Sequence, residues 1–279
     1  MKFTKMHGTG NDYIYINGFI EQIENPAEKA IRWSDRHKGI GSDGLVLILP
    51  SESSDFKMKM FNADGSESEM CGNASRCIGK YLYDKGMTNK TELTLETLAG
   101  EKKLSLFLGD DGKVDTVTVD MGEPVLVSEA IPTTISQARV INEPVIFSPD
   151  LQYNITTVSM GNPHAVIFSE DIANLNLSTI GPKIENASIF PNRINTEFIE
   201  IVSKNKVKMR VWERGSGETM ACGTGACASA VAGVLNGLTD RKIDIELLGG
   251  TLTIEWKTSD NHVYLTGNAV TVFEGEIEQ

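Results

Sequence analysis

The chain has 279 residues, with 26 basic and 38 acidic side chains and a formal net charge of −12. At about 150 residues per domain, this length predicts one large domain or two. The hydrophobic fraction of 40% suffices for a packed core and excludes wholesale disorder. The acidic balance argues against a nucleic-acid binder that tracks phosphates and against adhesion to anionic membranes, since both need a basic face.

The sequence predicts neither a secretory leader nor a membrane segment. No apolar stretch follows the first lysines, and the longest apolar run, Leu45 to Leu49, is far shorter than a membrane span. We therefore expect a cytoplasmic protein, where thiols stay reduced and the four cysteines form no disulfide scaffold.

Several familiar motifs fail on their spacing. Gly8-Thr-Gly10 is followed by Tyr13, where the dinucleotide-binding fingerprint needs a third glycine. The cysteines form no C-x-x-C pair and the four histidines are scattered, so we expect no metal site. Ser216 lacks the G-x-S-x-G frame of a hydrolase nucleophile.

A long-period repeat organises the chain. Its two Cys-Gly dipeptides, at Cys71 and Cys222, are 151 residues apart. The same offset carries residues 57–61 onto residues 208–212 with a conservative match at every position. Matches at one offset and in one order indicate a duplication. Further pairs at this offset are Gly10-Asn11 with Gly161-Asn162, Gly44–Ile48 with Asn195–Ile199, and Glu67-Ser68 with Glu218-Thr219.

In chain order, the first predicted helix is the amphipathic run 26–37, with a proline in its first turn. A second begins near Cys71 and ends near residue 83, and residues 91–121 follow as three strands separated by turns. The second half repeats this order, with an Ala- and Gly-rich helix over 222–235 and strands over 242–269. We therefore expect two similar mixed α/β halves with a ligand cleft between them.

Each half places a cysteine at the start of its most buried predicted helix. The N–H groups and the dipole at a helix N-terminus stabilise an anion, so a thiol there can ionise more readily than usual. If the halves are related by a pseudo-twofold axis, Cys71 and Cys222 face each other across the cleft. One thiolate could then remove a proton from one face of a carbon while the other thiol protonates the opposite face, which inverts a stereocentre. Cys77 and Cys227, inside the helices, are expected to be core thiols.

These segments resemble the active-site signatures of the diaminopimelate epimerase family. The signatures are Phe61–Asn73 and Trp212–Cys227, and His7–Asp12, Gly161–His164 and Val272–Glu276 match other family blocks. The resemblance covers essentially the whole chain. It implies a mixed α+β fold of two pseudo-symmetric domains, each a sheet or barrel wrapped around a central helix. It also implies interconversion of LL- and meso-diaminopimelate by a thiol pair, without a cofactor, on the route to lysine and peptidoglycan.

Together with the repeat, the resemblance implies one domain of residues 1–122 plus 265–279 and a second of residues 123–264. Cys71 belongs to the first domain and Cys222 to the second, and the active site would lie between them. The resemblance makes these thiols the acid and the base, exchanging roles with the direction of the reaction.

The remaining site residues also follow from the resemblance. His164 and Glu213 would tune the pKa values of the thiols. The resemblance further implies a small-molecule substrate, no metal and a homodimer. The substrate-binding residues would be Asn11, Asn62, Gly72, Asn73, Asn162, Asn195, Glu213, Arg214, Gly223 and Thr224.

The residues alone leave alternatives open. A proline racemase or hydroxyproline epimerase shares the thiol pair, but Asn73 stands where that pattern has a histidine. A thiol hydrolase with His164 as its base would not explain a cysteine in both halves. A non-catalytic amino-acid-binding module would carry unreactive thiols, and phenazine-biosynthesis isomerases lack the pair. Gly44 stands where some family members have glutamine, so no side chain there can reach the substrate.

Overall fold

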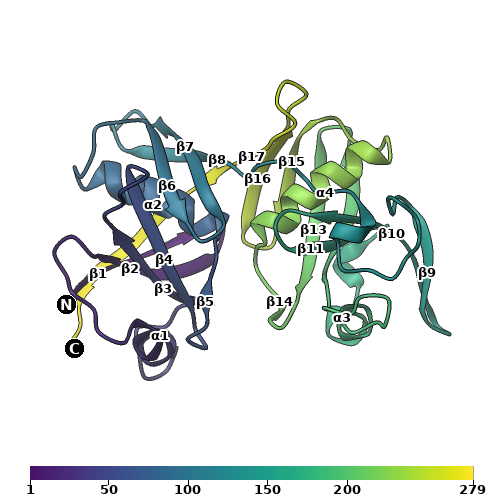
Figure 1. Ribbon diagram of the computed structural model, residues 1–279, viewed down its shortest axis with the longest axis horizontal. Helices are drawn as coiled ribbons and strands as arrows, with labels where there is room; N and C mark the ends of the chain where they lie inside the picture. The colour runs from purple at the N-terminus through teal and green to yellow at the C-terminus, as the bar shows by residue number, and fades with distance from the viewer. Residues whose placement is uncertain (279) are drawn as a thin grey trace. The chain divides into compact units, whose positions relative to one another are not determined.

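The computed structural model describes residues 1–278. Their contacts divide the chain into two compact units, Met1–Asp120 with the residues from Thr266 onward, and Met121–Leu265. Each unit consists mainly of strands with few helices, so the predicted mixed α+β class is confirmed (Figure 1).

In the N-terminal unit, antiparallel and parallel strand pairs alternate. Strands β1 and β2 are antiparallel, β2 and β3 parallel, β3 and β4 antiparallel, and β4 and β6 parallel. Antiparallel pairs β6–β7 and β7–β8 complete the series. The elements are β1 Lys2–Gly8, β2 Asn11–Asn17, α1 Pro26–Ser34, β3 Gly44–Leu49, β4 Phe56–Asn62, β5 Glu67–Ser68, α2 Gly72–Asp84, β6 Glu92–Thr97, β7 Gly100–Leu108, β8 Val114–Asp120 and β18 Val270–Glu276.

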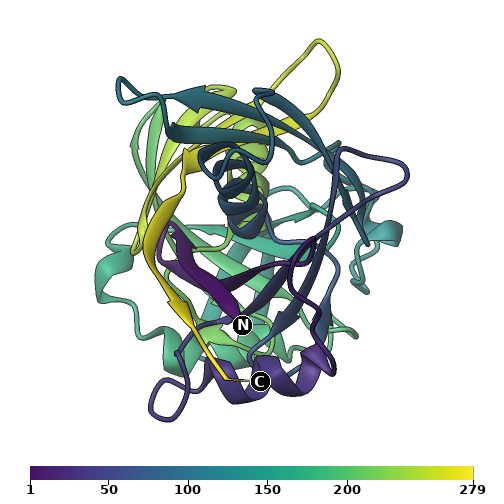
Figure 2. The ribbon, with the colours of Figure 1, turned by 90° about the vertical axis from the view of Figure 1, so that its left-hand side faces the viewer.

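Helix α2 is the central helix of this unit. Figure 2 shows it with strands on its several sides, and ten of its residues are buried. A central helix inside a curved sheet is the arrangement that the family resemblance implies, and it places the start of α2 among the strand ends.

The C-terminal unit repeats this arrangement around helix α4. Its strand pairs are antiparallel for β10–β11, parallel for β11–β12, antiparallel for β12–β13 and parallel for β13–β15. The elements are η1 Ser128–Ala130, β9 Glu143–Ser148, β10 Leu151–Ser159, β11 Pro163–Phe168, η2 Ile172–Asn174, α3 Leu177–Glu185, β12 Asn195–Ser203, β13 Lys206–Glu213, β14 Gly217–Glu218, α4 Gly223–Leu235, β15 Lys242–Leu247, β16 Gly250–Trp256 and β17 Val263–Asn268, which continues into the N-terminal unit.

The strand registers repeat as well as the strand order. In the N-terminal unit Tyr13 of β2 lies opposite Gly44 of β3, and in the C-terminal unit His164 of β11 lies opposite Asn195 of β12. Both residues of the second pair lie 151 positions after those of the first. The duplication therefore predicts which residues end up side by side in the second unit.

One helix prediction needs correction, and one helix was missed. The first helix ends at Ser34 instead of continuing to His37, because the Asp35 carboxylate accepts the backbone N–H groups of His37 and Lys38 at 2.8 and 2.9 Å and turns the chain. Helix α3 was not predicted, although its bounds lie 151 residues after those of α1.

Strand β18 pairs with a strand from the opposite end of the chain. It runs antiparallel to β1, with Lys2 opposite Glu276 and Thr4 opposite Glu274. The amino group of Met1 donates to the carbonyl oxygen of Ile277 at 2.8 Å. Strand β1 thus lies between β2 and β18 inside the sheet.

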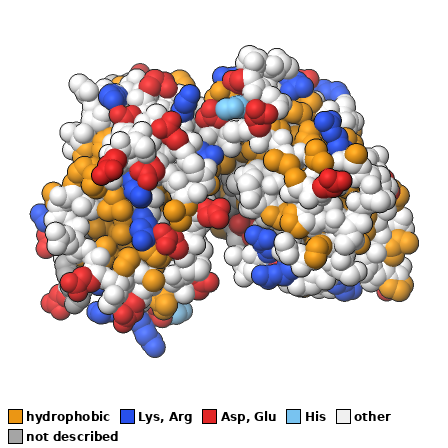
Figure 3. Space-filling view, in the orientation of Figure 1, with side chains coloured by type: hydrophobic (Ala, Val, Ile, Leu, Met, Phe, Trp, Pro, Cys, Tyr) orange, Lys and Arg blue, Asp and Glu red, His pale blue; other side chains and the backbone are white. Residues whose placement is uncertain are grey.

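Over residues 1–278, none of the helices combines the length and the apolar character needed to cross a membrane. On the face seen in Figure 3, acidic and basic side chains lie interspersed among apolar ones over each unit.

Candidate active site

Cys71 lies at the N-cap position of α2, as the sequence predicts. Its backbone is extended (φ −139°, ψ 120°), and its carbonyl oxygen accepts the first helical hydrogen bond, from the N–H of Ser75 at 2.9 Å. The half-buried thiol donates to Oδ1 of Asn11 at 3.5 Å. The same oxygen accepts from Nδ2 of Asn73 at 3.2 Å. Three of the predicted site residues therefore meet at this helix start.

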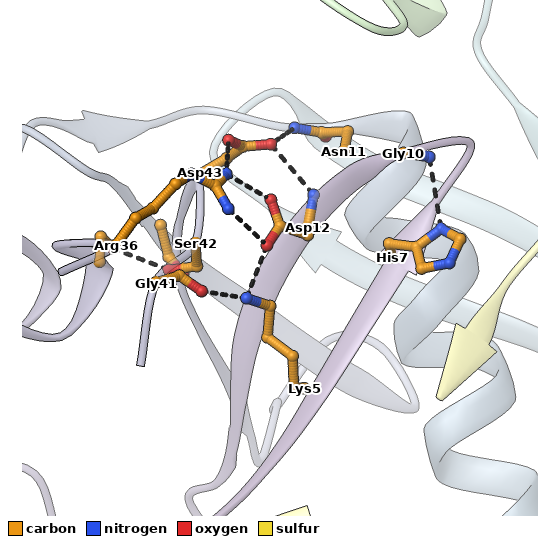
Figure 4. Close-up of polar contacts among 11 residues, drawn as sticks. Lys5, His7, Gly10, Asn11, Asp12, Arg36, Gly41, Ser42 and Asp43 are labelled. Carbon is orange, nitrogen blue, oxygen red and sulfur yellow. Dashed lines mark hydrogen bonds and ion pairs between the residues drawn. The ribbon is translucent and has the colours of Figure 1, made fainter. Parts of the chain in front are cut away.

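The other end of the Asn11 amide belongs to a network of charged residues. Nδ2 of Asn11 donates to Asp43 at 2.7 Å (Figure 4). Arg36 bridges Asp43 and Asp12 at 2.9 and 2.8 Å, and Lys5 lies 2.6 Å from Asp12. No motif in the sequence links these charged residues to the site.

Cys222 lies at the N-cap position of α4, but its sulfur has different neighbours. The sulfur accepts the backbone N–H of Gly225 at 3.4 Å, and the hydroxyl of Thr224 lies 3.5 Å away. The residue is only 5% exposed. Its carbonyl oxygen accepts the N–H of Ala226 at 2.9 Å, so the helix begins with the sulfur over its first free N–H groups.

Burial and two carboxylates keep Cys222 protonated. Burial raises the pKa of Cys222 well above its usual value, and the charges of Glu213 and Glu197 raise it further. Burial also raises the pKa of Glu213, against hydrogen bonds with Thr219 and Cys222 that lower it. The thiol and a carboxylate able to share its proton thus lie side by side.

His164 is held from both sides. Its Nδ1 lies 2.7 Å from Oε1 of Glu197, and both side chains are fully buried. Its Nε2 lies 2.8 Å from Oδ1 of Asn162. Parallel pairing of β11 with β12 places His164 and Glu197 on adjacent strands, so the imidazole is fixed by the sheet itself.

Asn195 and Arg214 are also in contact. Oδ1 of Asn195 accepts the backbone N–H of Arg214 at 2.9 Å, while its Nδ2 donates to the Pro163 carbonyl at 2.8 Å. The exposed guanidinium of Arg214 donates to the carbonyl oxygen of Asn192 at 3.1 Å. The buried asparagine therefore fixes the backbone from which the arginine extends.

Glu185, the last residue of α3, holds the turn that carries Arg214. Its Oε1 accepts the N–H of Gly215 at 2.9 Å and Nη1 of Arg193 at 3.0 Å. Its Oε2 accepts Nε1 of Trp212 at 2.7 Å. Three donors thus converge on a carboxylate that is 7% exposed.

Asn62 and Gly44 complete the predicted positions of the N-terminal unit. Asn62 ends β4, and its Nδ2 donates to the hydroxyl of Ser66 at 3.0 Å instead of joining Cys71. Gly44 lies opposite Asn62, and a Cβ there would lie 2.1 Å from the carbonyl oxygen of Phe61. The backbone therefore leaves no room for a counterpart of Asn195 in this unit.

Among residues 1–278, no three His, Cys, Asp or Glu side chains lie close enough together to hold a metal ion. The buried thiols Cys77 and Cys227 are each fully enclosed by their units.

A match to a known family decides the relationship of this chain. The family model described as Diaminopimelate epimerase matches residues 3–127 and 156–272. The chain belongs to the diaminopimelate epimerase family. It is 59% identical over 278 residues to a diaminopimelate epimerase of Acetivibrio thermocellus, covering 100% of this chain and 99% of that protein. It is 54% identical to one of Bacteroides thetaiotaomicron, covering 100% and 98%.

Solved structures show that the fold of this family member is shared more widely. A hydroxyproline epimerase from Agrobacterium vitis is similar with a TM-score of 0.68 at 15% identity, covering 99% of this chain and 91% of that one. A phenazine-biosynthesis protein of Bacillus anthracis is similar with a TM-score of 0.71 at 17% identity, covering 100% and 99%. At sequence identities of 15% and 17%, these similarities show a shared fold and nothing more.

Three residues of this epimerase-family site were missed from the sequence: Asp43, Glu197 and Glu185. Glu197 carried a signal, because it lies 151 residues after Val46 of the buried apolar strand β3, and a buried charge at such a position needs a partner. The offset of 151 from α1 would have found α3 and hence Glu185. Asp43 gave none, because its partner Asn11 lies 32 residues away in the sequence.

Proposed function

We propose that this chain inverts one α-carbon of diaminopimelate with Cys71 and Cys222 as paired acid and base. Membership of the diaminopimelate epimerase family makes the protein an isomerase that interconverts the LL and meso forms of this lysine and peptidoglycan precursor. The observation that supports the two-thiol mechanism is the repeated helix start: each unit has a cysteine at the N-cap of its central helix. One proton leaves one face of the carbon and another arrives on the opposite face, which inverts the centre.

The two thiols enter the reaction with different surroundings. The raised pKa of Cys222 makes it the resting proton donor, with Cys71 as the group that removes the α-proton. In the reverse direction the roles exchange, and the Glu213 carboxylate, whose own pKa is raised by burial, can share the proton of Cys222. His164 and Glu213 in this proposal act by setting the charge around that sulfur.

Substrate binding in this proposal uses helix starts and polar side chains of both units. The reacting carboxylate is met by the free N–H groups at the starts of α2 and α4, which favour anions. Arg214 grips the carboxylate at the far end of the substrate, since a guanidinium can bind a carboxylate with two parallel hydrogen bonds. The N–H groups belong to Gly72, Asn73, Gly223 and Thr224, and the other polar contacts to Asn11, Asn62, Asn162, Asn195 and Glu213.

Isotope exchange with single cysteine variants tests the mechanism. In D₂O the protein should place deuterium at one α-carbon of diaminopimelate while inverting it, with no cofactor added. Cys71→Ser and Cys222→Ser should each abolish inversion. Cys227 is a core thiol in α4, the helix that Cys222 caps, and Cys227→Ala should retain inversion. Near-normal epimerisation by either serine variant would exclude the paired mechanism. Proline and 4-hydroxyproline are the substrate controls, and neither should be inverted.

We further propose, from the family resemblance, that the protein is cytoplasmic and a homodimer. Sedimentation equilibrium over a range of protein concentrations tests the second point, and a mass of one chain throughout would refute it.

A further inference from the structure

The orientation of the Asn11 amide sets what Cys71 meets. Thr9 and Gly10 form a turn with positive φ (55° and 84°), which places Asn11 at the start of β2 beside the start of α2. With its carbonyl oxygen 3.5 Å from the Cys71 sulfur, the amide accepts a hydrogen bond from the thiol and so favours its protonated form. A reversed amide would present N–H to the sulfur and so favour the thiolate. The two orientations therefore tune the same cysteine in opposite directions.

Asp43 fixes that orientation. Its Oδ2 accepts Nδ2 of Asn11 at 2.7 Å and the backbone N–H of Asp12 at 3.0 Å. An ionised carboxylate only accepts hydrogen bonds, so the group of Asn11 that faces it must be the NH₂. Turning the amide over would set two oxygen atoms against each other. Asp43 therefore selects one of the two amide orientations.

The carboxylate of Asp43 is itself held in place. Arg36 donates to its Oδ1 at 2.9 Å and to Asp12 at 2.8 Å, while Lys5 pairs with the other oxygen of Asp12 at 2.6 Å and donates to the Gly41 carbonyl (Figure 4). Two cations thus hold two neighbouring carboxylates, and the side chain of Lys5 is only 8% exposed. Such a network resists rotation of any one member.

We infer that Asp43 is a positioning residue for the reaction, which holds the Asn11 carbonyl oxygen toward Cys71 so that this thiol carries its proton in the direction in which it acts as the acid. The role of Cys71 in the reaction rests on the proposed function. The arrangement belongs to the N-terminal unit alone: residue 194, at the offset of 151 from Asp43, is Ile194, and the Cys222 sulfur accepts an N–H group instead.

The reactivity of Cys71 toward iodoacetamide as a function of pH tests this inference without turnover. The experiment uses the full chain with Cys222→Ser, and mass spectrometry follows Cys71 alone. Tyr15 of β2 and Cys77 of α2 interact electrostatically with Cys71 within its unit, and both stay unchanged in the variants. Asp43→Asn frees the amide to turn, and the midpoint of the alkylation profile should fall by about one pH unit.

A double-variant cycle separates positioning from simple loss of charge. If Asp43 acts through the Asn11 amide, the downward shift caused by Asp43→Asn should vanish in the Asn11→Ala background. An equal shift in both backgrounds, or a shift in neither, would overturn the inference. The alkylation experiment measures no turnover. Its result for Asp43 can therefore be interpreted even if the isotope experiment refutes the two-thiol mechanism.

A second measurement keeps the inference testable if Asp43→Asn does not fold. In the unaltered protein, the side-chain NH₂ of Asn11 should show one strongly downfield proton with slowed exchange in ¹⁵N NMR spectra, as expected for a bond to a carboxylate. Two freely exchanging protons at ordinary amide shifts would contradict it.

Discussion

Glu185→Gln should loosen the turn that carries Arg214. The three partners of Glu185 are all donors: Trp212 Nε1 at 2.7 Å, Gly215 N at 2.9 Å and Arg193 Nη1 at 3.0 Å. Glutamine keeps the volume, but its NH₂ must face one of these donors. The least costly orientation gives up the indole, a bond to a charged acceptor worth about 1.5–3 kcal/mol. For a unit of this size, that loss lowers Tm by roughly 3 to 12 °C.

Calorimetry and steady-state kinetics together check this prediction. The control is Arg193→Gln, because the Arg193 side chain is 52% exposed and losing its ion pair costs at most about 1 kcal/mol. The value of kcat/KM for diaminopimelate should fall in Glu185→Gln, since Arg214 directly precedes the glycine whose N–H the carboxylate holds. A Tm no lower than that of Arg193→Gln would refute the reasoning.

Two further predictions concern packing and burial. Burial raises the pKa of the Cys77 thiol from 9.0 in the unfolded chain to about 11 in the folded protein. The folded state therefore gains stability from the neutral buried thiol at pH values below 9.0, and this gain is lost as the pH rises to about 11. Urea denaturation should show the unfolding free energy falling by roughly 3 kcal/mol more in the wild type than in Cys77→Ala over this range, and parallel curves would contradict this. At Gly181 of α3, a Cβ would lie 2.3 Å from the Trp212 ring. Gly181→Ala should therefore cost about 1–3 kcal/mol and shift the Trp212 fluorescence, whereas Lys183→Ala on the same helix should do neither.

Much of the fold followed from the sequence because the duplication repeats both order and register. The helix starts at Cys71 and Cys222 were predicted, and α2 and α4 begin at the next residue in each case. The strands predicted over 91–121 and 242–269 are also confirmed. Their period-two alternation is decided locally, by which side chains face the core.

What could not be predicted depends on contacts distant in the sequence. Local rules miss α3, because Pro182 argues against a helix there; only the offset of 151 from α1 points to this helix, which packs through Gly181 against Trp212. The partners of Asp43 and Glu185 lie on other elements, and no local pattern shows which carboxylate a given amide or indole will meet. The different surroundings of the two thiols likewise arise where the two copies have diverged.

Because β1 pairs with β18, the unit that is synthesised first is the last to receive all of its strands. The ribosome delivers Met121–Leu265 before Val270–Glu276, so the C-terminal unit can close while one side of β1 is still uncovered. Until β18 arrives, β1 is an open edge, the kind of strand that invites pairing with other chains. The half that emerges first, with Cys71 at its central helix, is therefore the half that is finished last.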